Sequence, residues 1–372
     1  MDTDNSNIVN IILEDDTEIL GNGQGHVAYR EYLPIMKYLS ILNSYSIKSS
    51  FFVDMAHLLF LKKNKDFKDF KIQANLLEQT ISTLIKHNMD IQLHIHSQWH
   101  NAKIADNKIN VSNKWSISQL EPNQQKELFS NCYNLLNSII LKQNFKHKLS
   151  AFKAGSWGLQ PFNILFNECY NKNINLIFGP SKELKIPKCG IDYTSMENAL
   201  FPYYCNELNI NKIGINKKIV VIPLTPTYLN WIDLFRYCIS KCIKDLIFKN
   251  QTDLDIIDAD FLHKLQLKNP MKNMHHIKAS FKPISTHLKI NSLPFWYLKK
   301  TFNRSYKKVI NSKNNYNLIV IETHSKNFKN NFKDINRFFK YIINKYQNIR
   351  FITVGDLKKD IENGNLLPTI NH

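Results

Sequence analysis

The sequence predicts one α/β domain, a distorted or incomplete (β/α) barrel of about seven or eight parallel strands with a helical insertion. Short apolar runs rich in β-branched and aromatic residues recur along the chain, and helical patterns separate them. The 372 residues are 43% hydrophobic, which is enough for one large core. Alternation of strand and helix favours parallel βαβ units, and about eight strands suggest a barrel.

Eight segments have the composition of strands covered on both faces. Such strands are continuous apolar runs, without the polar alternation of a half-exposed strand. The runs are residues 8–13, 49–54, 90–95, 149–152, 174–178, 219–225, 317–322 and 349–354. The clearest helix between them covers residues 72–88, where one apolar stripe is formed by Ile72, Leu76, Leu77, Ile81, Leu84 and Ile85.

Two segments depart from this alternation. Residues 227–310 are basic and aromatic and contain no clear strand, so we expect a helical insertion beside the site, or alternatively a small separate subdomain. Residues 359–372 are polar and are expected to form a mobile C-terminal tail. We therefore assign residues 1–358 to the barrel domain, with the insertion included.

Composition narrows the classes of protein to consider. The first residues, MDTDNSN, lack the basic and apolar regions of a signal peptide, and no run approaches the roughly 18 apolar residues of a membrane span. We therefore expect a soluble, cytoplasmic protein. The six cysteines contain no CxxC pair, which indicates neither a zinc ribbon nor a disulfide framework.

The net charge of +18 raises nucleic acid, anionic membranes or acidic glycans as partners. Only five of the 49 basic residues are arginine, the residue suited to bidentate contacts with phosphate and guanine. Lysine is accompanied by an excess of asparagine and isoleucine, which indicates a genome-wide compositional bias. We therefore expect no specific binding of nucleic acid.

Polar residues follow several of the apolar runs. The first run is followed by EDDTE (14–18), and the third ends inside HIHSQWH (94–100). The fourth is followed by KAGSWG (153–158), and the seventh by THS (323–325). In a parallel α/β barrel the chemistry gathers at the carboxyl ends of the strands. Acid, imidazole and cation at four strand ends predict a metal-dependent active site.

The three histidines of HIHSQWH have the spacing of metal ligands. His94 and His96 lie on one face of an extended strand, roughly 6.6 Å apart along the chain. If the chain coils after Ser97, His96 and His100 also lie on one side, as i and i+4 residues do. Either pair, joined by a carboxylate, would suit zinc or a similar divalent metal.

Taken in order, the motifs resemble those of the polysaccharide deacetylase family, the chitooligosaccharide deacetylase-like carbohydrate esterases. These motifs are EDDTE, SSFFVD, DIQLHIHSQW, FKAGSWG, VIPLT, and ETHS followed by FITVGDL. The resemblance implies a distorted (β/α) barrel and a divalent metal held by one aspartate and two histidines. It also implies hydrolysis of an N-acetyl or related acyl group on a sugar.

The resemblance also implies roles for individual residues. Asp15 would be the catalytic base and His324 the acid, while Asp16 would hold the metal with two of His94, His96 and His100. Two alternatives stay open: Asp16 or Glu18 takes the role of the base, and either His94 or the HSxxH spacing of His96 and His100 supplies the ligands. The metal would be one zinc ion, or alternatively cobalt or nickel.

Lys153 and Trp157 would bind the substrate, with Trp157 as a wall facing the sugar. Lys153 stands where arginine is usual in the family, so a point charge replaces a planar guanidinium. The expected function is deacetylation of a sugar or oligosaccharide in intracellular polysaccharide or glycoconjugate biosynthesis. A degenerate relative that binds glycan without hydrolysing it is the first alternative, and a basic nucleic-acid-binding protein is the second.

Overall fold

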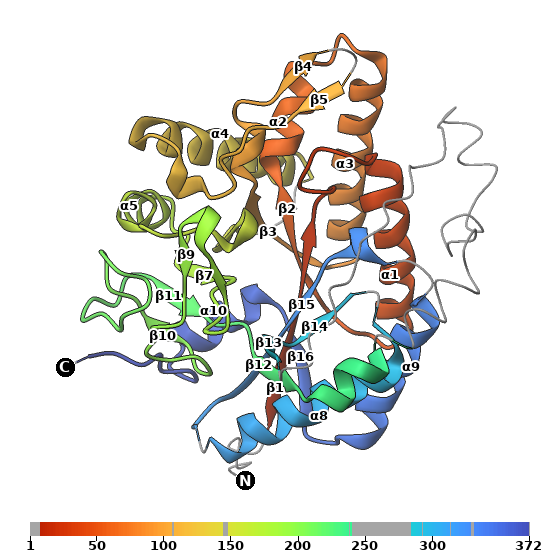
Figure 1. The fold of residues 1–372 in the computed structure, drawn as a ribbon, viewed down its shortest axis with the longest axis vertical. Helices are drawn as coiled ribbons and strands as arrows, with labels where there is room; N and C mark the ends of the chain where they lie inside the picture. Colours follow the sequence, from red (N-terminus) through yellow and green to blue (C-terminus); the bar gives the residue numbers. More distant parts are fainter. Residues whose placement is uncertain are drawn as a thin grey trace.

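The computed structural model describes residues 8–105, 108–143, 148–237, 239, 284–291, 293–312, 314–328 and 331–371. A curled sheet lies at the centre of the molecule, and helices cover its outer side (Figure 1). Within those ranges, no helix is both long and apolar enough to cross a membrane.

The central sheet has ten strands, and nine of them run in the order β10, β11, β7, β6, β3, β2, β1, β15, β14, while β16 pairs with β1. Every pair is parallel except that of β10 with β11. Each predicted run overlaps one strand of this sheet. The bounds are β1 Val9–Thr17, β2 Ser50–Asp54, β3 Asp90–Ile95, β6 Ala151–Ala154, β7 Leu176–Phe178, β10 Tyr203–Tyr204, β11 Val220–Ile222, β14 Lys289–Ile290, β15 Asn317–Thr323 and β16 Ile349–Ile352.

The helices follow the strands, as the alternation predicted. They are α1 Leu33–Ser44, α2 Met55–Lys63, α3 Lys68–Lys86, α4 Pro122–Lys142, α5 Asn163–Asn171, α8 Phe295–Asn311, α9 Phe332–Lys345 and α10 Val354–Glu362. The shorter turns are the π-helix η2 Ala28–Tyr32 and the 3-10 helices η3 Ser97–Trp99, η4 Ile117–Gln119, η5 Gly155–Trp157, η6 Pro187–Cys189 and η7 Ser325–Asn327. Three two-stranded pairs lie outside the main sheet: β4 Lys103–Ala105 with β5 Lys108–Asn110, β8 Lys185–Ile186 with β9 Ile191–Asp192, and β12 Pro226–Leu229 with β13 Ile284–His287.

The core has two parts because alternate residues of a strand point to opposite faces. Outward residues such as Ile11, Leu13 and Phe51 pack with the helices in the larger cluster. Inward residues form a second cluster inside the curled sheet, made up mainly of Ile12, Phe52, Ala151, Leu176, Phe178, Val220, Ile222, Leu318 and Val320. Further along the same strands the inward positions are polar, and the site lies there.

The segment expected to be a helical insertion differs from the prediction. Its described residues contain three short strands, β12, β13 and β14, as well as α8. β14 pairs with β15 and α8 connects the two, so this part is a βα unit of the barrel itself. Residues 240–283 of the expected insertion lie outside the described residues.

The C-terminal segment, expected to be a mobile polar tail, also differs. α10 extends to Glu362, and Leu366 is fully buried among the residues inside the sheet. The backbone of Thr369 accepts a hydrogen bond from Tyr204 at 2.9 Å and donates one to Pro202 at 3.0 Å. The segment is polar on average, and that average gave no sign of the one buried leucine within it.

We predict that Leu366→Ala lowers the free energy of unfolding by about 2–5 kcal/mol, because it removes a fully buried side chain and leaves a cavity. The neighbouring Leu367 is 72% exposed, so Leu367→Ala is a matched control whose effect should be small. Urea unfolding measures both variants. Equal effects would contradict the assignment of this segment to the core.

Candidate active site

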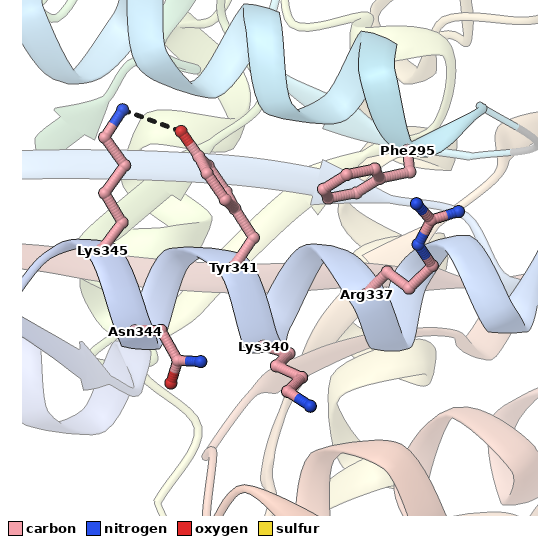
Figure 2. A pocket seen from close by; sticks show the side chains of 6 residues that line it. All are labelled: Phe295, Arg337, Lys340, Tyr341, Asn344 and Lys345. Carbon is pink, nitrogen blue, oxygen red and sulfur yellow. Dashed lines mark hydrogen bonds between the residues drawn. The ribbon is translucent and has the colours of Figure 1, made fainter.

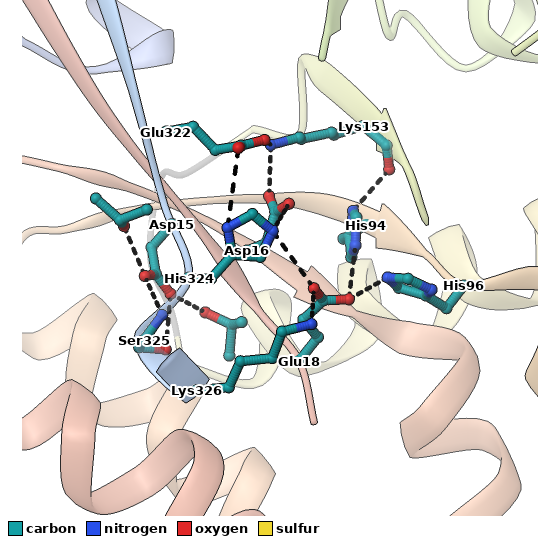
Figure 3. Close-up of polar contacts among 12 residues, drawn as sticks. Asp15, Asp16, Glu18, His94, His96, Lys153, Glu322, His324, Ser325 and Lys326 are labelled. Atoms are coloured by element: carbon teal, nitrogen blue, oxygen red, sulfur yellow. Dashed lines mark hydrogen bonds and ion pairs between the residues drawn. The ribbon is translucent and has the colours of Figure 1, made fainter. Parts of the chain in front are cut away.

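The polar residues at the carboxyl ends of β1, β3, β6 and β15 meet inside one end of the curled sheet (Figure 3). The sheet register explains the meeting. Glu14 pairs with Glu322 and His94 with Lys153 in adjacent parallel strands, so each pair faces the same side. The apolar layer formed by Ile12, Phe52 and Val320 lies one step back along the same strands.

The pleat of β1 divides the acidic run EDDTE. Glu14 and Asp16 point inward, whereas Asp15 lies on the face of Ile11 and Leu13. The Asp15 carboxylate accepts hydrogen bonds from Thr323 Oγ1 (2.7 Å), the Ser325 N–H (2.9 Å), Ser325 Oγ (3.0 Å) and Thr17 Oγ1 (3.2 Å). These four donors fill the acceptor sites of a carboxylate. Asp15, expected to be the base, thus ties β1 to the end of β15.

Lys153, expected to bind substrate, lies beneath the site and is fully buried. Its Nζ is 2.8 Å from Glu14 Oε1, 2.9 Å from Asp16 Oδ1 and 2.8 Å from Glu322 Oε1. Burial would lower the pKa of Lys153, but the three carboxylates raise it well above its usual range. Two of the three ammonium donors form hydrogen bonds with Glu14 and Glu322, and the contact with Asp16 is an ion pair. Because the whole side chain is buried among these carboxyls, it is not placed to contact a substrate.

The three carboxyls around Lys153 differ in the direction in which their pKa values are shifted. Burial raises the pKa of Glu14 well above its usual value, although Lys153 opposes the shift. For Asp16 and Glu322 burial acts in the same direction, but Lys153 and nearby histidines outweigh it and lower both pKa values. Glu14 is thus the carboxyl that most readily carries a proton.

His94 presents an unprotonated nitrogen to the site. Its Nδ1 lies 2.9 Å from the carbonyl oxygen of Lys153, which only accepts, so Nδ1 carries the proton in the neutral ring. His94 Nε2 is 3.4 Å from Glu18 Oε2, and both atoms are buried without a well-formed hydrogen bond to any described residue. A carbonyl that fixes the tautomer in this way is the usual support of a metal-bound imidazole.

His96 faces the same carboxylate oxygen. Its Nε2 forms an ion pair with Glu18 Oε2, and its Nδ1 lies 2.9 Å from the amide nitrogen and 3.1 Å from the amide oxygen of Gln98. Burial disfavours a charged His96, but Glu18 raises its pKa to about 9. Ligand atoms of Glu18, His94 and His96 all lie within 4.8 Å of one another.

This arrangement fits a bound cation. Two imidazole ring nitrogens and one carboxylate oxygen converge in a buried site, and a proton or a metal ion between them makes their contact favourable. Two histidines and a carboxylate are the donor set of zinc hydrolases. The ligand carboxylate in this cluster is Glu18, whereas the resemblance had implied Asp16.

His100 belongs to neither cluster of potential ligands found among the described residues. Residues Ser97–Trp99 form the 3-10 turn η3 rather than an α-helix. With three residues per turn, positions i and i+4 no longer share a face. The i, i+2 pair His94 and His96 on β3 is therefore the pair that the structure brings together.

Asp16 and His324 form the second part of the site. Asp16 Oδ2 is 3.2 Å from His324 Nε2, and with Glu322 these residues make up the other cluster. Burial lowers the pKa of His324, but Glu322 and Asp16 outweigh burial and raise it. His324 Nε2 is also 3.6 Å from Glu18 Oε1, so the two clusters adjoin.

The backbone after β6 adapts to this crowding. A Cβ on Gly155 would lie 2.6 Å from the His96 ring, closer than real Cβ contacts, so only glycine fits here. Ser156 (φ 52°) and Trp157 (φ 56°) both adopt the left-handed conformation, which is uncommon for residues other than glycine. The turn places Trp157, half-buried, so that its Nε1 donates to Glu322 Oε1 at 2.9 Å.

Sequence reasoning missed His287 and Glu322. His287 Nε2 is 2.6 Å from Glu322 Oε2, and both side chains are buried. His287 ends β13, within the stretch expected to be helical. The β-branched run before it was the available signal. Glu322 is the last residue of a predicted strand, and its inward parity with Leu318 and Val320 would have identified it.

Comparisons with known proteins bear on the fold. No family model and no curated protein matches the sequence. A structure from Mycobacterium smegmatis, classed provisionally as a polysaccharide deacetylase, matches 99% of this chain and 95% of its own, with a TM-score of 0.54 and 9% identity. That likeness confirms the predicted fold, a distorted barrel of the polysaccharide deacetylase type.

Two further structures score lower. One from Pseudomonas aeruginosa PAO1, also classed provisionally as a polysaccharide deacetylase, has a TM-score of 0.49 at 11% identity and covers 96% of this chain and 92% of its own. The PuuE allantoinase structure has a TM-score of 0.48 at 10% identity, with 96% and 91% covered.

We predict that Lys153→Met lowers the free energy of unfolding by about 3–5 kcal/mol at pH 7, because it leaves three buried carboxyls without their cation. Lys185 is the matched control, since it forms an exposed ion pair with Asp192 whose removal should change the free energy of unfolding little. Urea unfolding of Lys153→Met and Lys185→Met makes the comparison.

The same pair of variants carries a pH dependence. The pKa values of Asp16 and Glu322 are lowered in the fold, so the stability that Lys153 contributes through them is present above the ordinary carboxyl pKa. This stability is lost as pH falls from that ordinary range through the lowered values. The gap between wild type and Lys153→Met should therefore narrow in acid, and a gap that widens there would contradict the assignment.

Proposed function

We propose that this chain, which has the fold of the polysaccharide deacetylases, is a metal-dependent hydrolase that removes an N-acetyl or other acyl group from a sugar. One observation carries the proposal. The carboxylate of Glu18 and the ring nitrogens of His94 and His96 converge in a buried site directly beside a paired carboxylate and imidazole, Asp16 and His324. A metal site next to an acid–base pair is the equipment of an amide hydrolase.

Glu18, His94 and His96 would hold one divalent ion, zinc in the first instance, with cobalt or nickel as alternatives. When bound, such an ion polarises the acyl carbonyl and lowers the pKa of a water molecule. Three protein ligands leave a position open for this chemistry. The carbonyl of Lys153 and the amide of Gln98 keep the two rings in place.

Asp16 would act as the base and His324 as the acid. The lowered pKa of Asp16 keeps it ionised at neutral pH, and the raised pKa of His324 favours its protonated form. Asp16 would take the proton of the attacking water, and His324 would deliver one to the departing amine. When their surroundings keep one of two neighbouring groups ionised as a base and the other protonated as an acid, the two can share the steps of a hydrolysis.

The sugar part of the proposal rests on the fold and on Trp157. The Trp157 indole is half-buried, and its Nε1 donates a hydrogen bond to Glu322. The hydroxyl of Tyr193 donates to the backbone carbonyl oxygen of Trp157 at 2.6 Å. A fixed aromatic ring at the rim offers a flat apolar face to a sugar. An acetylated sugar or oligosaccharide used in polysaccharide or glycoconjugate biosynthesis is the proposed substrate.

We predict that the purified protein binds about one divalent transition metal per chain. Glu18→Gln and His94→Ala should each weaken metal binding by at least tenfold, as expected on loss of one of three protein ligands. His100→Ala is the control and should keep its metal, since His100 lies in neither cluster. Elemental analysis and titration with zinc measure both. Loss of metal in His100→Ala alone would return the ligand role to the HSxxH pair.

A second candidate function is glycan binding without hydrolysis. It is favoured by the ion pair of Lys326 with Glu18 Oε1, which neutralises part of the charge of the proposed ligand. Acetate release from acetylated sugars, with and without zinc, cobalt or nickel, separates the two functions. Binding of the sugars without any acetate release would favour the second.

We predict that His324→Ala lowers the turnover of N-acetyl substrates by roughly 10² to 10⁴, the usual contribution of a positioned acid. Metal content and KM should change little, because His324 is outside the cluster of Glu18, His94 and His96. Hydrolysis of an aryl acetate should be nearly unaffected, since phenoxide departs without a proton. His87→Ala changes an exposed histidine and serves as the control.

An equal loss on both substrates, or loss of metal, would contradict this role for His324. Either result would make it a ligand or a structural residue.

A further inference from the structure

One outer face of the barrel is strongly cationic. α8 carries Lys299, Lys300, Arg304, Lys307 and Lys308 and has no acidic residue. α9 carries four more basic residues and a single acid: Lys333, Arg337, Lys340 and Lys345, with Asp334. We call the exposed sides of α8 and α9 the basic face.

Aromatic rings lie among these cations (Figure 2). An open hollow of about 550 Å³ is lined by Phe295, Arg337, Lys340, Tyr341, Asn344 and Lys345. The Arg337 guanidinium lies 4.6 Å from the centre of the Phe295 ring, and Lys345 Nζ donates to the Tyr341 hydroxyl at 2.8 Å. The rings hold the charged groups in fixed positions at the surface.

An apolar stripe adjoins the basic face. Residues 231–237 are helical, and their exposed side carries Trp231 (55% exposed), Ile232 (52%) and Phe235 (52%). Ile239, 44% exposed, continues the i, i+4 spacing of Trp231 and Phe235. We call these four residues the apolar stripe.

Contacts join the stripe's helix to α8. Arg236 lies 4.7 Å from the centre of the Trp296 ring, and the rings of Tyr237 and Tyr297 are 5.5 Å apart. Asp233, which is buried, forms ion pairs with Lys300 and Arg304 of α8. The helix is thus fastened to α8 by its polar side, and its apolar side is exposed.

We propose that the basic face and the apolar stripe together dock this protein on a membrane surface of anionic phospholipids. An amphipathic helix with a Trp-containing apolar side next to lysines lies in the plane of a bilayer, with the apolar side among the headgroups. Lysines nearby are attracted to the negative leaflet. The net charge of +18 adds to this attraction.

Two other occupants suit the surface less well. A nucleic acid would engage the cations but leave Trp231, Ile232 and Phe235 in water. A second copy of the chain would bring two basic faces together, and like charges oppose that approach. An anionic lipid surface satisfies both the charge and the apolar side chains.

Sedimentation of the full chain with lipid vesicles tests the proposal. Vesicles of phosphatidylcholine mixed with phosphatidylserine should bind the protein at least about tenfold more tightly than pure phosphatidylcholine, and added salt should reduce the difference. The triple variant Trp231→Ser, Ile232→Ser, Phe235→Ser and the double variant Lys307→Glu, Lys308→Glu should each bind about tenfold more weakly.

Leu208→Ser with Ile215→Ser is the matched control, since these side chains are 76% and 70% exposed outside the basic face and the stripe. The control should bind as the wild type does. Acetate release from a soluble sugar should be unchanged in the triple variant, so a failure of the deacetylase proposal leaves this one intact.

Four results would overturn the proposal. Equal binding to both kinds of vesicle would remove the role of charge. Unchanged binding in the triple variant would remove the role of the stripe. Tight binding of nucleic acid by a protein that does not bind vesicles would assign the surface to nucleic acid. A dimer in analytical ultracentrifugation that the triple variant abolishes would assign it to a second copy of the chain.

Discussion

The architecture of the site depends on one buried ammonium. Lys153 brings one positive charge among Glu14, Asp16 and Glu322, which come from two strands and could not otherwise be buried so close together. Its ion pair keeps Asp16 ionised beside His324. The same residue's carbonyl fixes the His94 ring. Side chain and backbone of one residue thus support both the pair of Asp16 with His324 and the cluster of Glu18, His94 and His96. A surface role therefore suits Lys153 poorly.

Glu322 extends this support across the chain. It accepts from Lys153 and Trp157 on one oxygen and contacts His287 on the other. Its partners come from β6, the turn after β6, and β13, so the site exists only when distant segments have folded together. The left-handed turn at Ser156 and Trp157 is held in this way from two sides, by Glu322 and by Tyr193.

Sequence alone predicted eight of the ten strands of the main sheet because each is a continuous apolar run, and it placed the polar residues at the correct ends. It did not reveal that β1 continues to Thr17, since Asp and Glu are disfavoured in strands. Without that extension the faces of Asp15 and Asp16 were undetermined. The position of His100 depends on the kind of turn after Ser97, and that of His287 on a four-residue strand. Both elements are too short for hydrophobic periodicity to predict.

The continuation of β1 through the acidic run has an evolutionary consequence. Because the side-chain period of a strand is two, Glu14 and Asp16 face the interior while Asp15 between them faces the helices. A one-residue insertion or deletion within β1 would exchange these faces, turning Asp15 inward and both interior carboxyls, Glu14 and Asp16, outward. Related sequences that preserve this chemistry should therefore vary β1 by substitution only, and length changes should accumulate in the loops beyond Glu18.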